Sequence, residues 1–285
     1  MKIEKVIDIF QKLFPHEKLV TLNEKCGNEH DVVEINDRWI CKSGKTQEAA
    51  ILIARDVQLL QLLHGKITIC IPQVLFFEEG LLIYEKIVGV SLTLDFFSKL
   101  NQNQMDNLAA GIGLFLYELH NALPMNEVQG LGFEKTNWPW AAEKLQKAVH
   151  SIDQDLKNVF DIFITDYTHQ SAESNAALLH NDMAYQNIIV DEVTGKLHGI
   201  IDFTDAAIGN PHLDLRGRGQ HDQNLTRLIV DYYAHLSHQL IDYKKIENYY
   251  LATEFSRYFE YVQEGKLDEL ADQKDKILDF IKNHS

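Results

Sequence analysis

The stretch Leu178–Leu215 reads LLHNDMAYQNIIVDEVTGKLHGIIDFTDAAIGNPHLDL. It contains His180-Asn181-Asp182, and Asn187 follows Asp182 after four intervening residues. Asp202 comes fifteen residues after Asn187, at the end of an apolar run. Apolar runs over residues 176–179, 188–190 and 199–201 predict short buried strands. These strands would place Asp182 and Asn187 on one loop and Asp202 at the end of the next strand.

The spacing of these polar residues matches the catalytic segment of protein kinases, in which H-R-D is followed after four residues by Asn and later by D-F-G. Phosphoryl transfer needs in-line positioning, metal ions that neutralise phosphate oxygens, and a carboxylate beside the attacking hydroxyl. Asp182 is the candidate for that catalytic base. Asn187 and Asp202 offer hard oxygen ligands, which suit Mg²⁺. The sequence therefore predicts a Mg²⁺–nucleotide site and transfer of a phosphoryl group to a hydroxyl.

The same stretch resembles the signature of the aminoglycoside phosphotransferase and choline kinase superfamily, which is similar in fold to protein kinases. The matching segments are His180-Asn181-Asp182, Asn187-Ile188-Ile189, Ile201-Asp202-Phe203, Asp205-Ala206, Gly209-Asn210-Pro211 and Asp214-Leu215. The resemblance covers the chain from about Gly27 to Tyr233. It is closest to the branch that phosphorylates the 2″-hydroxyl of aminoglycosides.

This resemblance implies an α+β, protein-kinase-like fold with two lobes. The expected N-terminal lobe, residues 1–88 with the hinge, carries a small antiparallel sheet and binds the nucleotide. The expected C-terminal lobe, residues 89–285, is larger, mainly helical, and carries the catalytic and substrate-binding residues.

Two segments of the small lobe are candidates to hold phosphates. Lys42 ends Trp39-Ile40-Cys41-Lys42, which occupies the place of the kinase V-A-I-K strand, and is expected to contact the α- and β-phosphates. Gly27 and Asn28 lie in the link between two predicted strands, at 19–23 and 31–35. That position makes the link the candidate phosphate loop, since glycine lets backbone amides approach closely.

An acid on the helix expected over residues 46–64 should pair with Lys42. By resemblance the matching residue is Asp56, although the family usually has the longer Glu there. Glu48, nearer the start of the helix, is the alternative, and a first-turn Glu is also favoured by the helix dipole alone.

The remaining small-lobe strands are expected at 67–71, 74–77 and 81–84, followed by the connector between the lobes. In the connector, the main chain around Tyr84, Glu85 and Ile87 is expected to hold the purine. Because main-chain groups make these contacts, the sequence leaves ATP and GTP equally open as phosphoryl donors.

In the large lobe, the resemblance gives His180 and Asp214 as structural support for the catalytic loop. Asp205 is a candidate to contact the acceptor, or to brace the loop, or to cap a helix. Glu254 is a further candidate contact for a substrate amine. Arg216 and Arg218 depart from the family pattern, and exposed arginines there would suit a polycationic acceptor poorly.

Composition narrows the class of partner. The chain of 285 residues has a formal net charge of −15, which argues against nucleic acid or an anionic membrane and is compatible with a cationic small substrate. The cysteines, Cys26, Cys41 and Cys70, predict neither a disulfide framework nor a zinc site. With no signal peptide and no run long enough to span a bilayer, we expect a cytoplasmic protein.

The sequence thus predicts an enzyme that uses ATP or GTP with Mg²⁺ to phosphorylate a small hydroxylated molecule, with aminoglycoside antibiotics as the leading acceptors by resemblance. A metabolic small-molecule kinase for choline-like, sugar or macrolide acceptors is the first alternative, because fold does not fix an acceptor. A catalytically silent nucleotide-binding module is the second.

Overall fold

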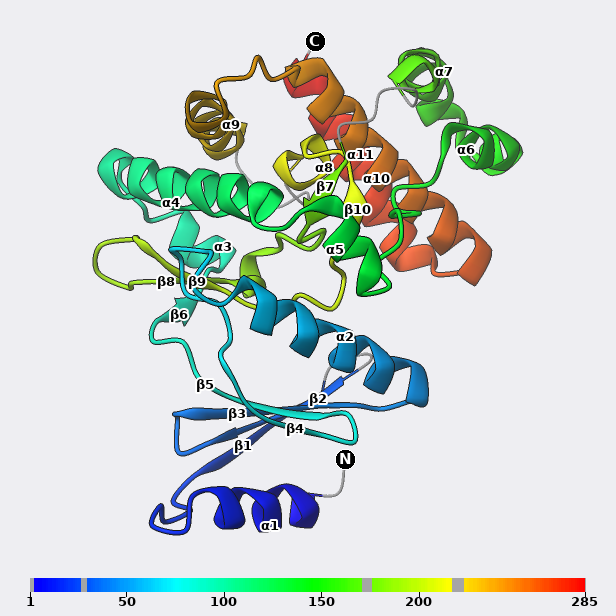
Figure 1. Cartoon of the computed structure of the whole chain (residues 1–285). Helices are drawn as coiled ribbons and strands as arrows, with labels where there is room; N and C mark the ends of the chain where they lie inside the picture. The colour runs from blue at the N-terminus through cyan, green and yellow to red at the C-terminus, as the bar shows by residue number, and fades with distance from the viewer. Residues whose placement is uncertain (1–2, 27–29, 171–175, 217–222, 285) are drawn as a thin grey trace.

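An antiparallel sheet of five strands forms the small lobe at the N-terminal end of the chain (Figure 1). The computed structural model describes residues 3–26, 30–170, 176–216 and 223–284. The sheet has the order β1-β2-β3-β5-β4, with strands β1 (Leu22–Cys26), β2 (His30–Ile35), β3 (Trp39–Gly44), β4 (Val74–Glu78) and β5 (Leu81–Glu85). Asn36 and Asp37 join β2 to β3 with φ of 55° and 54°, as a tight hairpin turn requires.

Two helices cover opposite faces of this sheet, because successive strand residues point to opposite sides. Helix α1 (Ile3–Leu13) buries Val6 and Phe10 in a cluster with Trp39, Cys41 and Ile83. On the other face, α2 (Gln47–Leu63) packs Ile53 and Val57 against Leu82 and Tyr84. The Thr46 side chain accepts a hydrogen bond from the Ala49 amide and so caps the start of α2.

The second half of α2 belongs to the core of the large lobe. Its residues Leu59, Leu60 and Leu63 are buried in the main hydrophobic cluster there. Helix α2 therefore packs its first half on the sheet of the small lobe and its second half in the core of the large lobe.

The segment 67–71 was expected to be a small-lobe strand, and this prediction was wrong. It lies against the large lobe, where Ile200 donates its amide hydrogen to the Cys70 carbonyl at 3.0 Å and Thr68 donates to the Glu118 carboxylate. Gly199 allows this approach, since a Cβ there would lie 2.7 Å from the Cys70 oxygen. A local apolar pattern cannot tell which sheet or lobe a short segment will join.

The connector between the lobes is anchored on both sides. Lys86 donates its amide hydrogen to the Arg38 carbonyl on the small lobe, and the Val88 carbonyl accepts from His198 of the large lobe. Gly89 has φ of 133°, and a Cβ there would lie 2.5 Å from the Val190 oxygen, so the chain needs glycine to enter the large lobe.

The large lobe is mainly helical, as expected, with two small antiparallel sheets ordered β6-β8-β9 and β10-β7. Its strands are β6 (Val90–Ser91), β7 (Ala177–Leu179), β8 (Ile188–Val190), β9 (Leu197–Ile200) and β10 (Ala207–Gly209). Its helices are α3 (Leu94–Phe97), α4 (Gln102–Asn121), α5 (Met125–Gly130), α6 (Ala142–Ala148), α7 (Gln154–Gln170), α8 (His212–Leu215), α9 (Gln223–Ser237), α10 (Tyr243–Glu264) and α11 (Leu267–His284), with 3-10 turns η1 (Val149–Ser151) and η2 (Tyr185–Asn187).

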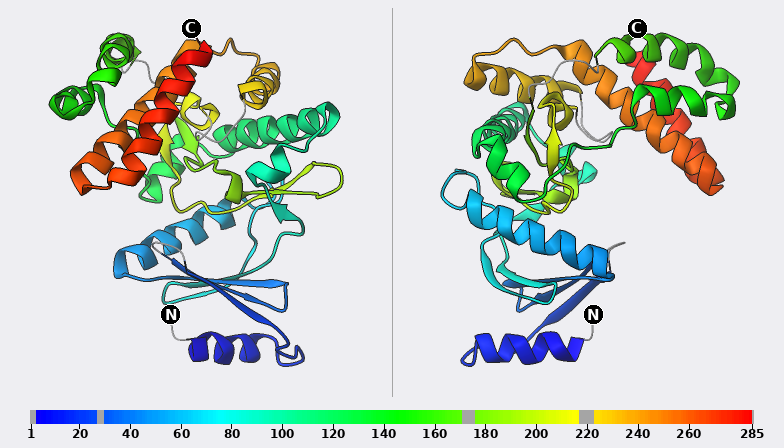
Figure 2. Two further views of the ribbon diagram at one scale, coloured as in Figure 1. Left: turned by 180° about the vertical axis from the view of Figure 1, so that it is seen from behind. Right: turned by 45° about the vertical axis from the view of Figure 1, so that its right-hand side comes forward.

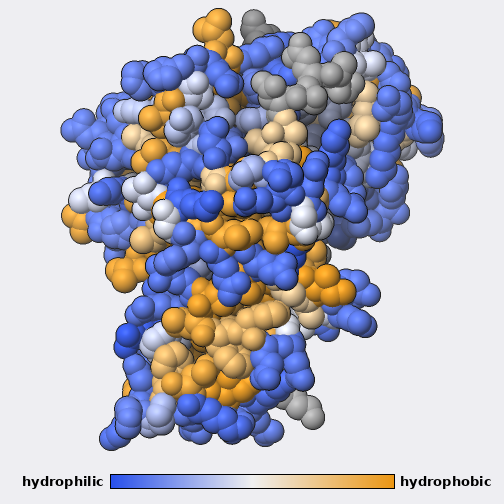
Figure 3. Space-filling view, in the orientation of Figure 1, coloured by the Kyte–Doolittle hydropathy of each residue, from blue (hydrophilic) through white to orange (hydrophobic). Residues whose placement is uncertain are grey.

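Two hydrophobic clusters divide the large lobe. One surrounds α4, α9 and the strands that carry the catalytic segment, and the other joins α6, α7, α10 and α11 (Figure 2). Figure 3 shows a largely hydrophilic surface on this face of the large lobe, with apolar residues gathered mainly over the small lobe and toward the junction of the lobes. Within the described ranges, no helix is both long and apolar enough to cross a bilayer.

Replacing Phe10 by alanine should destabilise the protein by about 3–5 kcal/mol, because the fully buried ring packs beside Phe14 and Trp39 and its loss leaves a cavity. Denaturant unfolding followed by circular dichroism would measure this. Lys12→Ala, on the exposed side of the same helix, is the control and should change the free energy of unfolding by less than about 0.5 kcal/mol. Equal stability of the two variants would contradict the packing described for α1.

Candidate active site

The loop after β7 presents Asp182 and fixes it through Asn187. The Asn187 side-chain amide donates to Asp182 Oδ2 at 2.9 Å and to the Asp182 carbonyl at 3.0 Å. Asn187 is buried in the η2 turn that closes the loop. Since the amide nitrogen is used in this way, the side-chain oxygen is the atom of Asn187 that can ligate a cation.

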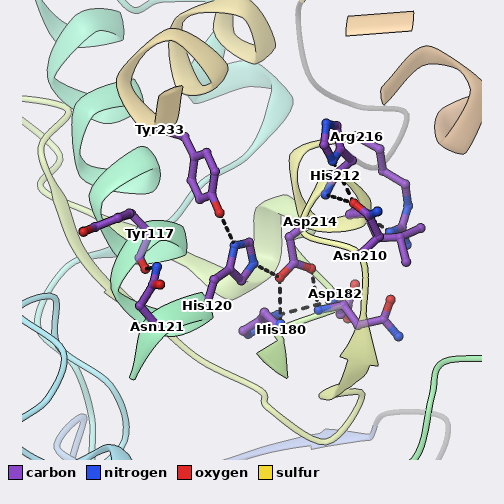
Figure 4. A network of polar contacts seen from close by, with 12 residues as sticks. Tyr117, His120, Asn121, His180, Asp182, Asn210, His212, Asp214, Arg216 and Tyr233 are labelled. Carbon is purple, nitrogen blue, oxygen red and sulfur yellow. Dashed lines mark hydrogen bonds and ion pairs between the residues drawn. The ribbon is translucent and has the colours of Figure 1, made fainter. Parts of the chain in front are cut away.

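A buried carboxylate holds the base of this loop (Figure 4). Asp214 accepts hydrogen bonds from the His180 amide at 2.8 Å and the Asn181 amide at 2.7 Å, and contacts His120 Nε2 at 3.1 Å. His120 Nδ1 lies 2.9 Å from the Tyr233 hydroxyl. Burial alone would raise the pKa of Asp214, but the hydrogen bond and charge of His120 and the Asn181 amide lower it below its ordinary value. The structure therefore places both His180 and Asp214 at the foot of the catalytic loop.

His180 links the catalytic loop to the strand that carries Asp202. Its Nδ1 accepts from the Asp182 amide at 3.2 Å, so Nε2 carries the proton and donates to the Ile201 carbonyl at 3.1 Å. The imidazole also packs edge-on against Phe203. These contacts set the distance between the loop of Asp182 and the turn of Asp202.

Asp202 forms an ion pair across the two lobes. Lys42 Nζ lies 2.8 Å from Asp202 Oδ1, and Lys42 is buried in β3. The Thr204 hydroxyl donates to the same oxygen. Burial alone would raise the pKa of Asp202, but the Lys42 charge and the hydrogen bonds from Lys42 and Thr204 lower it to about 2. Asp202 is therefore ionised throughout the physiological pH range and can act as an anionic ligand.

Two residues of the site have left-handed backbone conformations. Asn181 has φ of 64° and Asp202 has φ of 65°, values that are uncommon for residues with a side chain. The Asn181 side chain is tied to the Asp205 carbonyl at 3.2 Å. Such strain persists only where surrounding contacts impose it, and it concentrates at functional sites.

The expected pairing of Lys42 with an acid of α2 is not the one observed. Lys42 bonds to Asp202, whereas Asp56 is buried behind it and interacts with the lysine charge at longer range. Aspartate is one methylene shorter than the glutamate usual in the family, which accounts for the missing contact. Burial raises the pKa of Asp56 to about 7, against the lowering effect of Lys42. Glu48 is exposed in the first turn of α2, so it is not the partner either.

The other predicted nucleotide contacts lie in the connector or outside the described residues. Tyr84 is buried at the end of β5, and Glu85 is exposed and pairs with Arg38. Ile87 follows, in the stretch between β5 and β6. Gly27 and Asn28 fall outside the described ranges, as does Arg218.

The two predicted substrate contacts, Asp205 and Glu254, lie in different surroundings. Asp205 is exposed beside the Asp202 turn. Glu254 is instead buried between α10 and α11, where its carboxylate accepts a hydrogen bond from Gln273. That prediction was wrong, because a buried carboxylate used in helix packing cannot reach a substrate. Arg216, whose role the sequence left open, is buried and donates to the Leu213 carbonyl.

A pocket of about 590 Å³ opens where the two hydrophobic clusters of the large lobe meet. Trp138, Pro139 and Tyr249 contribute apolar surface, and Thr136, Asn210 and Glu260 contribute polar groups. Thr136 connects this pocket to the catalytic loop, since its hydroxyl oxygen lies 3.4 Å from the Asn181 side-chain nitrogen, one residue before Asp182. Concave sites with apolar walls and a few polar groups are the usual form of small-molecule sites.

Three residues of the site were not predicted from the sequence: Thr136, Thr204 and Arg55, whose Nη2 donates to the Thr204 carbonyl. Thr204 was detectable only as the residue two positions after Asp202, and Thr136 lies in a segment with no motif. Arg55 directly precedes Asp56, but an arginine on a helix has no signal that separates it from solvent-exposed ones.

The two-lobed fold, with a lysine–aspartate pair between the lobes and an aspartate–asparagine loop beside it, defines a kinase-like phosphotransferase. Residues 25–245 match the sequence model described as "Phosphotransferase enzyme family". The chain belongs to this family, and it is an enzyme that transfers phosphoryl groups to alcohol acceptors.

Solved structures share the whole fold. The GDP complex of wild-type aminoglycoside 2′-phosphotransferase-IIIa has a TM-score of 0.83 with 21% identity over 100% of both chains. The GDP and kanamycin complex of an APH(2″) enzyme has a TM-score of 0.80 with 21% identity over 99% of both chains. Macrolide 2′-phosphotransferase MphH from Brachybacterium faecium has a TM-score of 0.70 with 16% identity over 96% of this chain and 97% of that one. A comparison with functionally curated proteins gives no significant match.

Asp56→Asn should change how stability depends on pH. A raised aspartate pKa means that the native state keeps a proton which the unfolded chain releases, so this group lowers stability as pH rises from about 4 to about 7. Asparagine removes that dependence, and the variant should gain stability relative to the parent protein between pH 5 and pH 8. Denaturant unfolding at both pH values measures this, with Glu48→Gln on the same helix as the control. An equal difference between variant and parent at both pH values would contradict the raised pKa.

Proposed function

We propose that this enzyme transfers the γ-phosphoryl group of ATP or GTP to a hydroxyl of a small acceptor, with aminoglycosides as the leading class. The observation that carries the proposal is the pair of contacts at the cleft: Asn187 holds Asp182, and Lys42 of the small lobe holds Asp202 of the large lobe. These four side chains are the parts that kinase-type phosphoryl transfer requires.

Each residue has one task in this mechanism. Asp182 orients the acceptor hydroxyl and accepts its proton as the oxygen attacks phosphorus, while the bond to the leaving nucleoside diphosphate breaks. Lys42 contacts the phosphates of the donor, and the main chain around Tyr84, Glu85 and Ile87 holds the purine ring of the nucleotide. Gly27 and Asn28 are proposed to cover the phosphates, by their position in the sequence.

The residues at the cleft also fit a magnesium ion. Asp202 is an ionised carboxylate and Asn187 keeps an amide oxygen, and both are the hard donors that Mg²⁺ prefers. Among the described residues no cluster of three or more histidine, cysteine or acidic side chains is present. Two protein ligands are enough, because Mg²⁺ in kinase sites completes its shell with water and phosphate oxygens. When bound, the ion would neutralise charge on those oxygens.

Several observations support a cationic, ring-containing acceptor. The net charge of −15 attracts cations, and Asp205 is an exposed acid next to the Asp202 turn. The pocket beside the catalytic loop offers Trp138 and Tyr249 as surfaces for a sugar ring and Glu260 as an acid. The burial of Arg216 removes one objection to a polycationic acceptor. A cytoplasmic location, where ATP and GTP are available, is part of this proposal.

A macrolide is the second candidate acceptor. Lys135 and Lys144 also line the pocket, and Lys144 Nζ lies 3.4 Å from the centre of the Trp140 ring. The aromatic walls would suit an apolar macrocycle, and these cations would not favour a further amine. A metabolic kinase for choline-like or sugar acceptors shares the same machinery. A silent nucleotide-binding module would not need the Asp182–Asn187 contact.

Asp182→Ala should lower kcat by about 10²–10⁴-fold, because it removes the base, while Mg²⁺–nucleotide still binds. The assay is nucleotide turnover with ATP and GTP separately against aminoglycosides, macrolides, choline and amino sugars. Turnover stimulated by an aminoglycoside and lost in the variant supports the leading proposal, and stimulation by a macrolide alone supports the second. Turnover that survives in Asp182→Ala would remove this residue from the reaction.

Asp202→Ala should instead weaken Mg²⁺–nucleotide binding and leave Lys42 without its partner. Calorimetric titration of the nucleotide with and without Mg²⁺ would show a loss of metal dependence. Asp191→Ala, in the exposed turn between β8 and β9, is the matched control and should bind like the parent. An unchanged metal dependence in Asp202→Ala would contradict the proposed ligand role.

Trp138→Ala should raise KM for the acceptor about tenfold with kcat nearly unchanged, because the ring is proposed to bind a part of the acceptor away from the reacting hydroxyl. The KM for nucleotide should not change. Tyr232→Ala, an exposed aromatic on α9, serves as the control. Equal KM values for Trp138→Ala and the parent would remove the pocket from the acceptor site.

A further inference from the structure

Arg55 belongs to the small lobe, but its side chain contacts residues of the large lobe. It lies on α2, yet its Nη2 donates to the Thr204 carbonyl at 3.2 Å. Its guanidinium stacks over the Phe133 ring, 4.4 Å from the ring centre, and Phe133 is buried in the main cluster of the large lobe. The two contacts fix both the direction and the plane of the guanidinium, which a lysine could not reproduce fully.

The contact with Thr204 leads directly to Asp202. The Thr204 hydroxyl donates to Asp202 Oδ1, the same oxygen that accepts from Lys42. Arg55 therefore touches one end of a three-residue turn, and its partner Thr204 touches the carboxylate at the other end. Asp202 has a left-handed φ of 65°, a strained conformation that the surrounding contacts must maintain.

Asp56, the neighbour of Arg55 on α2, interacts with the other member of the Lys42–Asp202 ion pair. Asp56 is buried and interacts electrostatically with Lys42, and Arg55 donates to the Thr204 carbonyl of the Asp202 turn. Both residues lie on one turn of α2, whose second half is buried in the large-lobe core. One helix turn thus carries groups directed to both members of the Lys42–Asp202 pair.

We infer that Arg55 is a positioning residue for the phosphoryl-transfer step: it holds the Asp202–Thr204 turn so that Asp202 keeps its place between Lys42 and the donor phosphates. The inference rests on the role proposed above for Asp202. Arg55 touches neither the catalytic base nor its asparagine, so its effect passes through the turn. The negative groups Asp205 and Glu134 near the guanidinium help to retain it there.

The test compares Arg55→Met and Arg55→Lys with the parent enzyme. We expect Arg55→Met to lower kcat about tenfold to a hundredfold, the size of effect that a small misplacement of a reacting group produces, with KM for the acceptor nearly unchanged. Arg55→Lys should recover part of the loss, since lysine can still donate to the Thr204 carbonyl. Arg227→Met, an exposed arginine on α9, is the matched control and should retain the parent kcat.

A double-mutant cycle separates positioning from general destabilisation. Thr204→Val removes the hydroxyl that binds Asp202, so in that background Arg55→Met should lower kcat by clearly less than it does alone. Equal losses in both backgrounds would overturn the inference. Hydrogen exchange of the ligand-free protein provides a readout apart from activity: Arg55→Met should speed exchange in peptides covering residues 201–206 and leave α9 unchanged. Unchanged exchange at 201–206 would also overturn it.

Asp202→Ala, measured in the same series, shows whether a negative result contradicts the proposed role of Asp202 or only the inference about Arg55. If Asp202→Ala does not affect Mg²⁺–nucleotide binding, the proposed function of the turn fails. If it does, and Arg55→Met keeps the parent kcat, the function stands and the inference about Arg55 is wrong.

Discussion

The buried carboxylate of Asp214 determines the shape of the catalytic loop. A buried charge costs several kcal/mol unless it is paired and hydrogen-bonded. Here the partners are two consecutive backbone amides of the loop, together with His120 from α4. The backbone of Asn181 takes a left-handed conformation directly after these two amides, where the chain turns toward Asp182. The charge of Asp214 is therefore satisfied by the loop itself, and the loop leads directly into Asp182, whose carboxylate Asn187 holds.

A buried charge that needs a partner also lies at the boundary between the lobes. Lys42 is buried, and its ion-pair partner Asp202 belongs to the other lobe, so this ion pair forms only when the lobes are together. Helix α2 contributes to both bodies, with Ile53 and Val57 on the small-lobe sheet and Leu59 and Leu63 in the large-lobe core. The division at residue 88 stays a prediction, and the packing shares α2 and the segment 67–71 with the large lobe.

The fold, and the strands and loops that carry Asp182, Asn187 and Asp202, could be predicted from the sequence because their signals are local. The spacing of Asp182, Asn187 and Asp202, together with short apolar runs, was enough to place them on neighbouring strands and loops. Long-range choices were not predictable in this way. Whether Lys42 would meet Asp56 or Asp202 depends on a contact between residues 160 positions apart. Glu254 looks like any acidic residue of a helix, and only the packing of α11 against α10 shows that it is buried.

Because residues 67–71 dock on the large lobe, the chain passes between the lobes three times instead of once. The chain leaves the small lobe along α2, is fastened by Thr68 and Cys70, returns to form β4 and β5, and leaves again through the connector at 86–89. A protease cut in the connector would therefore not release the small lobe, because α2 and its anchored tail would still hold the two fragments together.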